Sequence, residues 1–170
     1  MTPTDARFRP GARVGVDVGN ARVGVAASGA AGALAHPVRT LRRDTGADGD
    51  VEAIVELEPE LEAIEVVVGL PRLLSGQEGE AARIARDYAG RLASRLGSVG
   101  VRMVDERLTT VDAHRRLRDS GVPGRGQRAV VDQAAAVLIL QSALDTEALS
   151  GMPPGEIIMP GGKRKKERRR

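Results

Sequence analysis

Three acidic residues stand at the ends of three different predicted secondary-structure elements, far apart in the sequence. Asp17 closes a strand-like run of valines, Glu106 follows a second apolar run, and Asp132 lies in an apolar, helix-like segment. A carboxylate in apolar surroundings costs free energy unless it has a partner. Any fold of this chain must therefore bring partners, or one shared partner, to these three positions.

The first of these acids lies in a segment that predicts a β-hairpin. Residues 13–18 and 22–28 alternate valines with small residues, as strands do, and Gly19-Asn20 between them tolerates the positive φ of a tight turn. Asp17 comes just before that turn. It either binds nearby backbone N–H groups, as aspartates in turns do, or serves as a ligand.

The rest of the chain alternates helical and strand patterns, which predicts an α/β fold with three antiparallel strands followed by parallel strands. Ser75 with Glu78 three residues later has the form of a helix-starting capping box. The last helix is apolar on nearly every side and should be buried. The predicted elements after the hairpin are a strand at 33–41, a helix from near Asp50, a strand at 64–70, a helix at 76–96, a strand at 101–105 and two helices, one from near Thr109 and one at 127–149.

At 170 residues the chain fits one domain, predicted at 13–149, with an N-terminal tail at 1–12 and a disordered basic tail at 150–170. Residues 163–170 hold seven basic side chains and one acid, so they carry +6, and the net charge of +3 leaves −3 for the rest. This tail either increases non-specific attraction to phosphates or merely aids solubility.

Two of the three acids need a further argument. Successive strand residues point to opposite faces, so Asp105 and Glu106 cannot both face one site, and we assign Glu106 to it. Asp132 lies one turn inside the last helix. The helix dipole offers it partial compensation, and a bound cation would compensate it better.

The chemistry of such a cation follows from the residues that the chain has. There is no cysteine, and His36 and His114 are the two histidines, so a zinc site is not expected and oxygen ligands remain. Mg²⁺ and Mn²⁺ are the hard ions that suit carboxylates. The N-terminal residues lack a signal-peptide pattern and no apolar run is long enough to span a bilayer, so we expect a cytoplasmic protein without a membrane partner.

Four segments carry more specific patterns: VDVGNARVGVA at 16–26, VVGLP at 67–71, VDERLTT at 104–110 and VDQAAAVLILQ at 131–141. Together with residues 75–96 they cover most of the predicted domain, and they resemble the YqgF/RuvX family within the ribonuclease H-like superfamily. The family commonly has Ser-Asp after the second strand, whereas here Ser28 is followed by Gly29, so no accessory acid is expected there. The strand at 64–70 also ends without a carboxylate, which leaves Glu106 as the third acid.

This resemblance implies a ribonuclease H-like fold with a mixed five-stranded sheet flanked by helices. It also implies a metal-dependent nuclease that cleaves phosphodiester bonds by a two-metal mechanism, with Asp17, Glu106 and Asp132 as catalytic metal ligands. The family description favours processing of the 5′ end of pre-16S rRNA. Guanidinium groups match phosphate oxygens, so the candidates for nucleic-acid contacts are Arg22, Arg107, Arg115, Arg118, Arg125 and Arg128, although some of these would lie on a solvated face.

Three alternatives remain open at this point. A Holliday-junction resolvase would cut branched DNA and would be expected to act as a homodimer. A non-catalytic nucleic-acid-binding module would keep the arginines without needing three acids. Finally, Asp17-Val18-Gly19 with Gly24 also resembles the phosphate-binding hairpin of actin-like ATPases and sugar kinases, but those proteins close two such domains over the nucleotide.

Overall fold

A six-stranded mixed sheet forms the centre of the protein, in a computed structural model that describes residues 8–31, 34–108 and 125–160. The predicted helix from near Thr109 lies outside these residues. The strands are β1 (Ala12–Val18), β2 (Arg22–Ser28), β3 (Ala35–Arg42), β4 (Ala63–Leu70), β5 (Gly100–Asp105) and β6 (Glu156–Ile158); the helices are α1 (Gly49–Leu61), α2 (Glu80–Leu96) and α4 (Arg125–Ser150), with a short 3-10 helix η1 (Glu106–Leu108).

The strand order is β3-β2-β1-β4-β5-β6, so β1 and β4 lie at the centre. β1, β2 and β3 pair antiparallel, and β1, β4 and β5 pair parallel, which confirms the predicted mixed sheet. The prediction of five strands was wrong by one, because β6 pairs antiparallel with β5. This strand lies within the segment predicted as a C-terminal tail, and the predicted domain boundaries stay a prediction.

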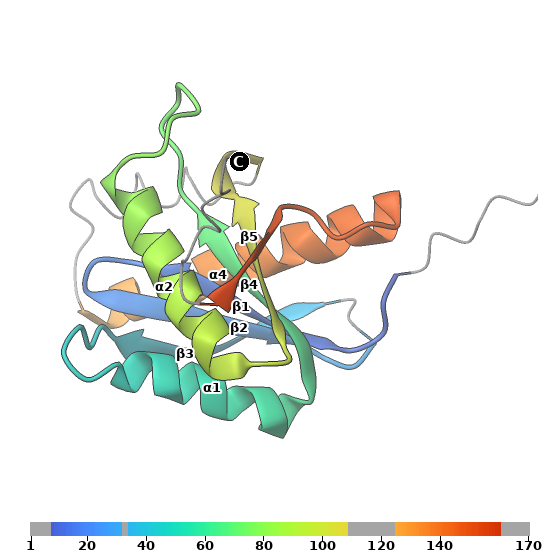
Figure 1. Ribbon diagram of the computed structural model, residues 1–170, viewed down its shortest axis with the longest axis horizontal. Coiled ribbons are helices and arrows are strands. Elements are labelled where there is room, and N and C mark those ends of the chain that lie inside the picture. The colour runs from blue at the N-terminus through green and yellow to red at the C-terminus, as the bar shows by residue number, and fades with distance from the viewer. Residues whose placement is uncertain (1–7, 32–33, 109–124, 161–170) are drawn as a thin grey trace, which may run out of the picture.

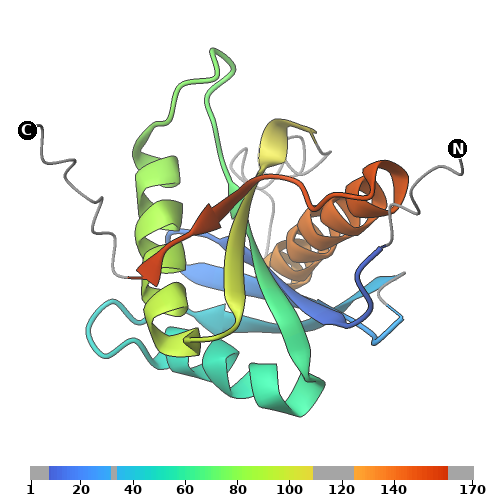
Figure 2. The same cartoon turned by 45° about the vertical axis from the view of Figure 1, so that its right-hand side comes forward.

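Helices cover both faces of the sheet, with α1 and α2 on one face and α4 on the other (Figures 1 and 2). The strand period of two decides what each face receives. In β1, Val14, Val16 and Val18 point into the core beneath α1 and α2, whereas Gly15 packs against α4. Asp17 shares the parity of Gly15, so the acid of the central strand lies on the α4 face.

Two local predictions were wrong. Neither Gly19 nor Asn20 adopts a positive φ in the turn, which is closed by a hydrogen bond from Gly19 N–H to the carbonyl of Arg22 at 2.9 Å. The capping box does not form: α2 begins at Glu80, where Gly79 stands at the N-cap without a side-chain hydrogen bond. Ser75 instead accepts a hydrogen bond from the backbone of Gln77.

The last helix, α4, is buried along one stripe and not on every side as predicted. Val130 and Leu149 are largely exposed although both are apolar. Its buried residues recur three or four positions apart, which is the spacing of a single helix face. None of the helices in the described parts of the chain combines the length and apolar character needed to cross a membrane.

Candidate functional site

The three predicted site acids are buried on the α4 face of the sheet. Asp17 is 1% exposed, and Glu106 and Asp132 are each 2% exposed. They come from the end of β1, the start of η1 and the second turn of α4, so the fold brings together positions that are far apart in the sequence. Two glycines in neighbouring strands determine how closely these acids approach one another.

The first glycine, Gly24, brings the backbone of Asp132 close to Asp17. Gly24 is the register partner of Asp17 across the β1–β2 ladder. A Cβ built on Gly24 would lie 2.0 Å from the backbone carbonyl oxygen of Asp132, a distance that no atom pair tolerates. The absence of a side chain therefore lets α4 rest directly on β2, one strand away from Asp17.

The second glycine, Gly69, does the same for Glu106 on the other side of Asp17. The parallel β1–β4 ladder pairs Val16 with Val68, so Gly69 continues the ladder beside Asp17. A Cβ on Gly69 would lie 2.4 Å from Glu106 Oε1, which means that the carboxylate occupies the space above this glycine. Asp17 therefore lies between Gly24 on β2 and Gly69 on β4, and adjacent strands of a sheet are about 4.8 Å apart.

The carboxylates nevertheless do not form a ready-made metal cluster. Among residues 8–31, 34–108 and 125–160, no group of three or more potential ligands is placed to hold an ion as the side chains stand. Asp132 instead pairs with Arg22, which donates from Nε to Asp132 Oδ2 at 2.7 Å. The arginine comes from the same strand as Gly24, two residues earlier, and supplies a positive charge to the buried acid.

Asp105 points away from this site and is held by arginines. Its carboxylate accepts hydrogen bonds from the backbone and side chain of Arg107, and Arg72 approaches it at 3.6 Å. The hydrogen bond from the Arg107 side chain outweighs burial and lowers the pKa of Asp105 below its ordinary value. Glu106 instead shares the strand parity of Arg102 and Val104, which face α4. Asp105 and Glu106 therefore lie on opposite faces of the sheet, and the choice of Glu106 as a site residue stays a prediction.

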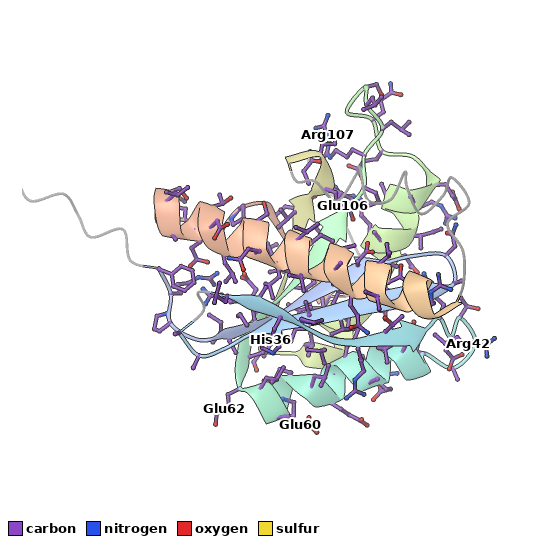
Figure 3. The ribbon with its side chains drawn as sticks, turned by 180° about the vertical axis from the view of Figure 1, so that it is seen from behind. His36, Arg42, Glu60, Glu62, Glu106 and Arg107 are labelled. Atoms are coloured by element: carbon purple, nitrogen blue, oxygen red, sulfur yellow. The ribbon has the colours of Figure 1, made fainter. Side chains whose placement is uncertain are left out.

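The predicted nucleic-acid contacts are only partly described. Arg22 lies in the site. Arg107 is exposed next to Glu106, and Figure 3 labels Glu106 and Arg107. Arg115 and Arg118 lie outside the described residues. Arg125 and Arg128 belong to the first turn of α4, and their side chains are not among those described.

Sequence reasoning missed the structural part of the site. Gly24 and Gly69 each interrupt an apolar strand, and a glycine inside a strand is a known signal of close backbone approach. Arg43, which follows β3, holds the turn between β1 and β2, and no sequence pattern singles it out.

A mixed sheet in this order, with a buried acid on its central strand and another on the helix that covers it, defines an α/β protein with an acidic site on one face of its sheet. The chain belongs to the RuvX family: the model of that family, described as Holliday junction resolvase, matches residues 11–146. Its activity class is that of a nuclease, a hydrolase of nucleic acid.

Relatives from several organisms are similar over most of their length, and each is named as a candidate pre-16S rRNA nuclease. The Nocardioides protein is 57% identical over 89% of this chain and 98% of its own. The Frankia casuarinae protein is 56% identical over 83% and 70%, and that of Mycobacterium strain KMS is 52% identical over 92% and 98%. Among solved structures, RuvC of T. thermophilus in complex with a Holliday junction substrate is 16% identical over 85% of this chain and 99% of its own, with a TM-score of 0.48, a likeness too weak to carry an inference.

Proposed function

We propose that this protein is a metal-dependent nuclease that hydrolyses phosphodiester bonds of precursor 16S rRNA, with Asp17, Glu106 and Asp132 as its catalytic acids. The observation that carries the proposal is the burial of these three carboxylates on one face of the sheet, with Asp17 between the other two. Burying three acids together is costly, so an arrangement of this kind calls for positive charge.

The donor set fits Mg²⁺ or Mn²⁺, because all three side chains offer oxygen and none offers nitrogen or sulfur. Such ions, when bound, neutralise the acids, activate a water for attack on phosphorus and stabilise the leaving oxygen. Asp17 is the residue that would contact both ions, since it lies between Gly24 and Gly69, over which Asp132 and Glu106 lie. Glu106 and Asp132 would each supply a metal ligand from one side of Asp17.

Arg22 has a separate part in this proposal. Its guanidinium neutralises Asp132 while it remains 28% exposed. A charge that reaches both the buried acid and solvent is well placed to meet a substrate phosphate at the rim of the site. The exposed Arg107, whose side chain binds Asp105 outside the site, would contact the nucleic-acid backbone beyond it.

The substrate is assigned from the relatives, which carry the name pre-16S rRNA nuclease. We therefore place the protein in the cytoplasm, in maturation of the 5′ end of 16S rRNA. The family description favours a second function, cleavage of a Holliday junction in recombination, for which the protein would act as a homodimer.

Parallel cleavage assays test both functions. Purified protein is incubated with Mg²⁺, Mn²⁺ or no metal, on pre-16S RNA, single-stranded RNA and a four-way DNA junction. We expect metal-dependent cleavage that is fastest on pre-16S RNA. Asp17→Asn and Glu106→Gln should lower the rate by at least about 10³-fold, since each removes a metal ligand.

Asp105→Asn is the matched control, because it changes the neighbouring acid on the opposite face. Its rate should stay within a few-fold of the unaltered protein. Equal losses in the Asp105 and Glu106 variants would contradict the assigned site. Preference for the four-way junction would establish the resolvase, and absence of cleavage from every substrate would leave a non-catalytic binding module.

A further inference from the structure

Arg43 holds the turn that joins β1 to β2 from outside the hairpin. The backbone N–H of Arg43 donates to the carbonyl of Ala21 at 2.9 Å, and its Nη1 donates to the carbonyl of Gly19 at 3.1 Å. These two carbonyls flank the turn between Asp17 on β1 and Arg22 on β2. Arg43 therefore contacts the segment that links two residues of the proposed site without touching the site itself.

Arg43 is fixed in turn by two buried residues on the opposite face of the sheet. Its side chain is 9% exposed, and its Nε lies 3.6 Å from Oδ2 of Asp50, whose side chain is 1% exposed. Its guanidinium stacks on the ring of Tyr88, with 5.2 Å between Cζ and the ring centroid. Asp50 comes from the first turn of α1 and Tyr88 from α2, so both helices of that face position one arginine.

Arg91 provides an internal comparison. It also approaches the ring of Tyr88, at 5.7 Å, and it forms ion pairs with Asp48 and Asp87. Each of its ion pairs lies among α1, α2 and the loop before α1. Arg43 and Arg91 thus make similar contacts with the same buried ring, but the hydrogen bonds to the hairpin turn are those of Arg43.

The burial of the Asp50–Arg43 pair argues for a positioning role. A surface arginine could cap the turn equally well, and a buried ion pair is a poor source of net stability because both charges lose their water. What burial provides is a fixed direction: a planar guanidinium held by an acid and an aromatic ring has little freedom left. The β1–β2 turn, which is hydrogen-bonded to this guanidinium, is held in place in the same way.

We infer that Arg43, held by Asp50 and Tyr88, is a positioning residue that fixes the β1–β2 turn and so the placement of Asp17 and Arg22. The inference rests on the proposed function for its effect on turnover, but its structural part does not. Removal of the bond to Gly19 should loosen the turn and displace the Asp17 carboxylate. A displacement of about 1 Å can cost a hundredfold in rate.

The test compares Arg43→Met and Arg43→Lys with the matched variants Arg91→Met and Arg91→Lys. Methionine keeps an unbranched stem against the ring and removes the donors. Lysine keeps the charge near Asp50 and supplies a folded variant in case methionine is not tolerated. It lacks the planar fork by which Arg43 reaches Gly19 with Nη1 while Nε faces Asp50. Thermal unfolding, amide hydrogen exchange, kcat and KM are measured for each.

We expect both Arg43 variants to speed exchange of the Gly19 amide about tenfold, as local opening of the turn becomes easier. We also expect kcat to fall about 10- to 100-fold with KM changed less than twofold, because placement and not binding is lost. The Arg91 variants should lower the melting temperature but change neither the exchange rate of the Gly19 amide nor kcat. Asp50→Asn should lower kcat when it is the only substitution. In the Arg43→Met background it should lower kcat no further, since Asp50 acts through Arg43.

Equal exchange of the Gly19 amide in the Arg43 and Arg91 variants would overturn the inference, whatever the kinetics. Faster exchange with unchanged kcat would also overturn it, because the turn would then be looser without consequence for the site. If the unaltered protein cleaves no nucleic acid, the proposed function fails. The exchange comparison then decides alone whether Arg43 holds the turn.

Discussion

Two residues without side chains determine the geometry of the site as much as the acids do. The backbone of Asp132 packs directly on Gly24, and the carboxylate of Glu106 packs on Gly69. Each glycine lies in a strand next to Asp17, one on either side. The placement of Asp132 and Glu106 around Asp17 therefore depends on the absence of a side chain at these two positions.

Gly24→Ala tests this point at the scale of one methyl group. The new Cβ would meet the carbonyl of Asp132, so α4 must move away from β2. We expect the free energy of unfolding to fall by about 3 kcal/mol, the upper end of the range for overpacking, and cleavage to be lost. Urea denaturation and a cleavage assay measure the two effects.

Gly90→Ala is the control for this substitution. Gly90 lies inside α2 and a Cβ there meets nothing within 4 Å. Alanine should therefore raise the free energy of unfolding by about 0.5–1 kcal/mol and leave cleavage unchanged. A Gly24 variant as stable and active as the Gly90 variant would show that close packing at β2 is unnecessary.

The orientation of single side chains was predictable where the signal is local. The strand period of two predicts that Asp105 and Glu106 face opposite sides, and in the structure Asp105 bonds Arg107 whereas Glu106 lies over Gly69. The contact between Arg22 and Asp132 was not predictable, because it joins positions 110 residues apart in the sequence. Its formation depends on α4 docking on β2, which no local pattern encodes.

At the scale of elements, sequence patterns predicted which segments fold better than where they begin and end. The apolar stripe of α2 predicted the helix, but its start was placed too early, at residue 76 instead of Glu80. Ser75 and Glu78 have the spacing of a capping box, yet Glu78 pairs with Arg86 and Arg72. β6 was missed because a three-residue strand depends on its pairing with β5 and has little pattern of its own.

Ser75→Ala should therefore change the free energy of unfolding by less than about 0.5 kcal/mol, where loss of a true N-cap costs about 1 kcal/mol. Asp44→Ala is the comparison, because the Asp44 carboxylate accepts hydrogen bonds from the backbone of Gly46, Ala47 and Gly49 at the start of α1. We expect the larger drop in melting temperature for Asp44. A larger drop in melting temperature for Ser75→Ala than for Asp44→Ala would show that Ser75 does act as an N-cap.

At the scale of the whole molecule, the end of α4 away from the site is anchored by buried charges. Glu147 accepts hydrogen bonds from Arg9 and from Arg13, which is 1% exposed. Arg9 and Arg102 also bind Glu65 on β4. The cluster joins the start of the described chain, the central sheet and α4, and Arg9 belongs to the segment predicted as an N-terminal tail.

Glu147→Gln should lower the free energy of unfolding by about 3 kcal/mol at pH 7, because it leaves Arg13 buried without its charged partner. Burial raises the pKa of Glu147, but the hydrogen bonds from Arg9 and the charge of Arg13 outweigh burial and lower it. A lowered pKa contributes stability that is present above the ordinary carboxyl pKa and is lost as the pH falls through the folded value.

The difference in stability between the unaltered protein and the glutamine variant should therefore be constant near neutrality and shrink below about pH 4. Urea denaturation at a series of pH values measures it. A difference that stays the same down to pH 3 would show that packing, and not the charge of Glu147, anchors the helix.

The same helix carries Glu147 at one end of its buried face and Asp132 near the other. With a rise of 1.5 Å per residue, the two positions are about 22 Å apart. A tilt of about three degrees about the anchored end would swing the distant carboxylate by about 1 Å, enough to slow the reaction up to a hundredfold. Substitutions around Arg13 and Glu147 can thus slow turnover by tilting α4 and displacing Asp132, although these residues do not contact the reacting atoms.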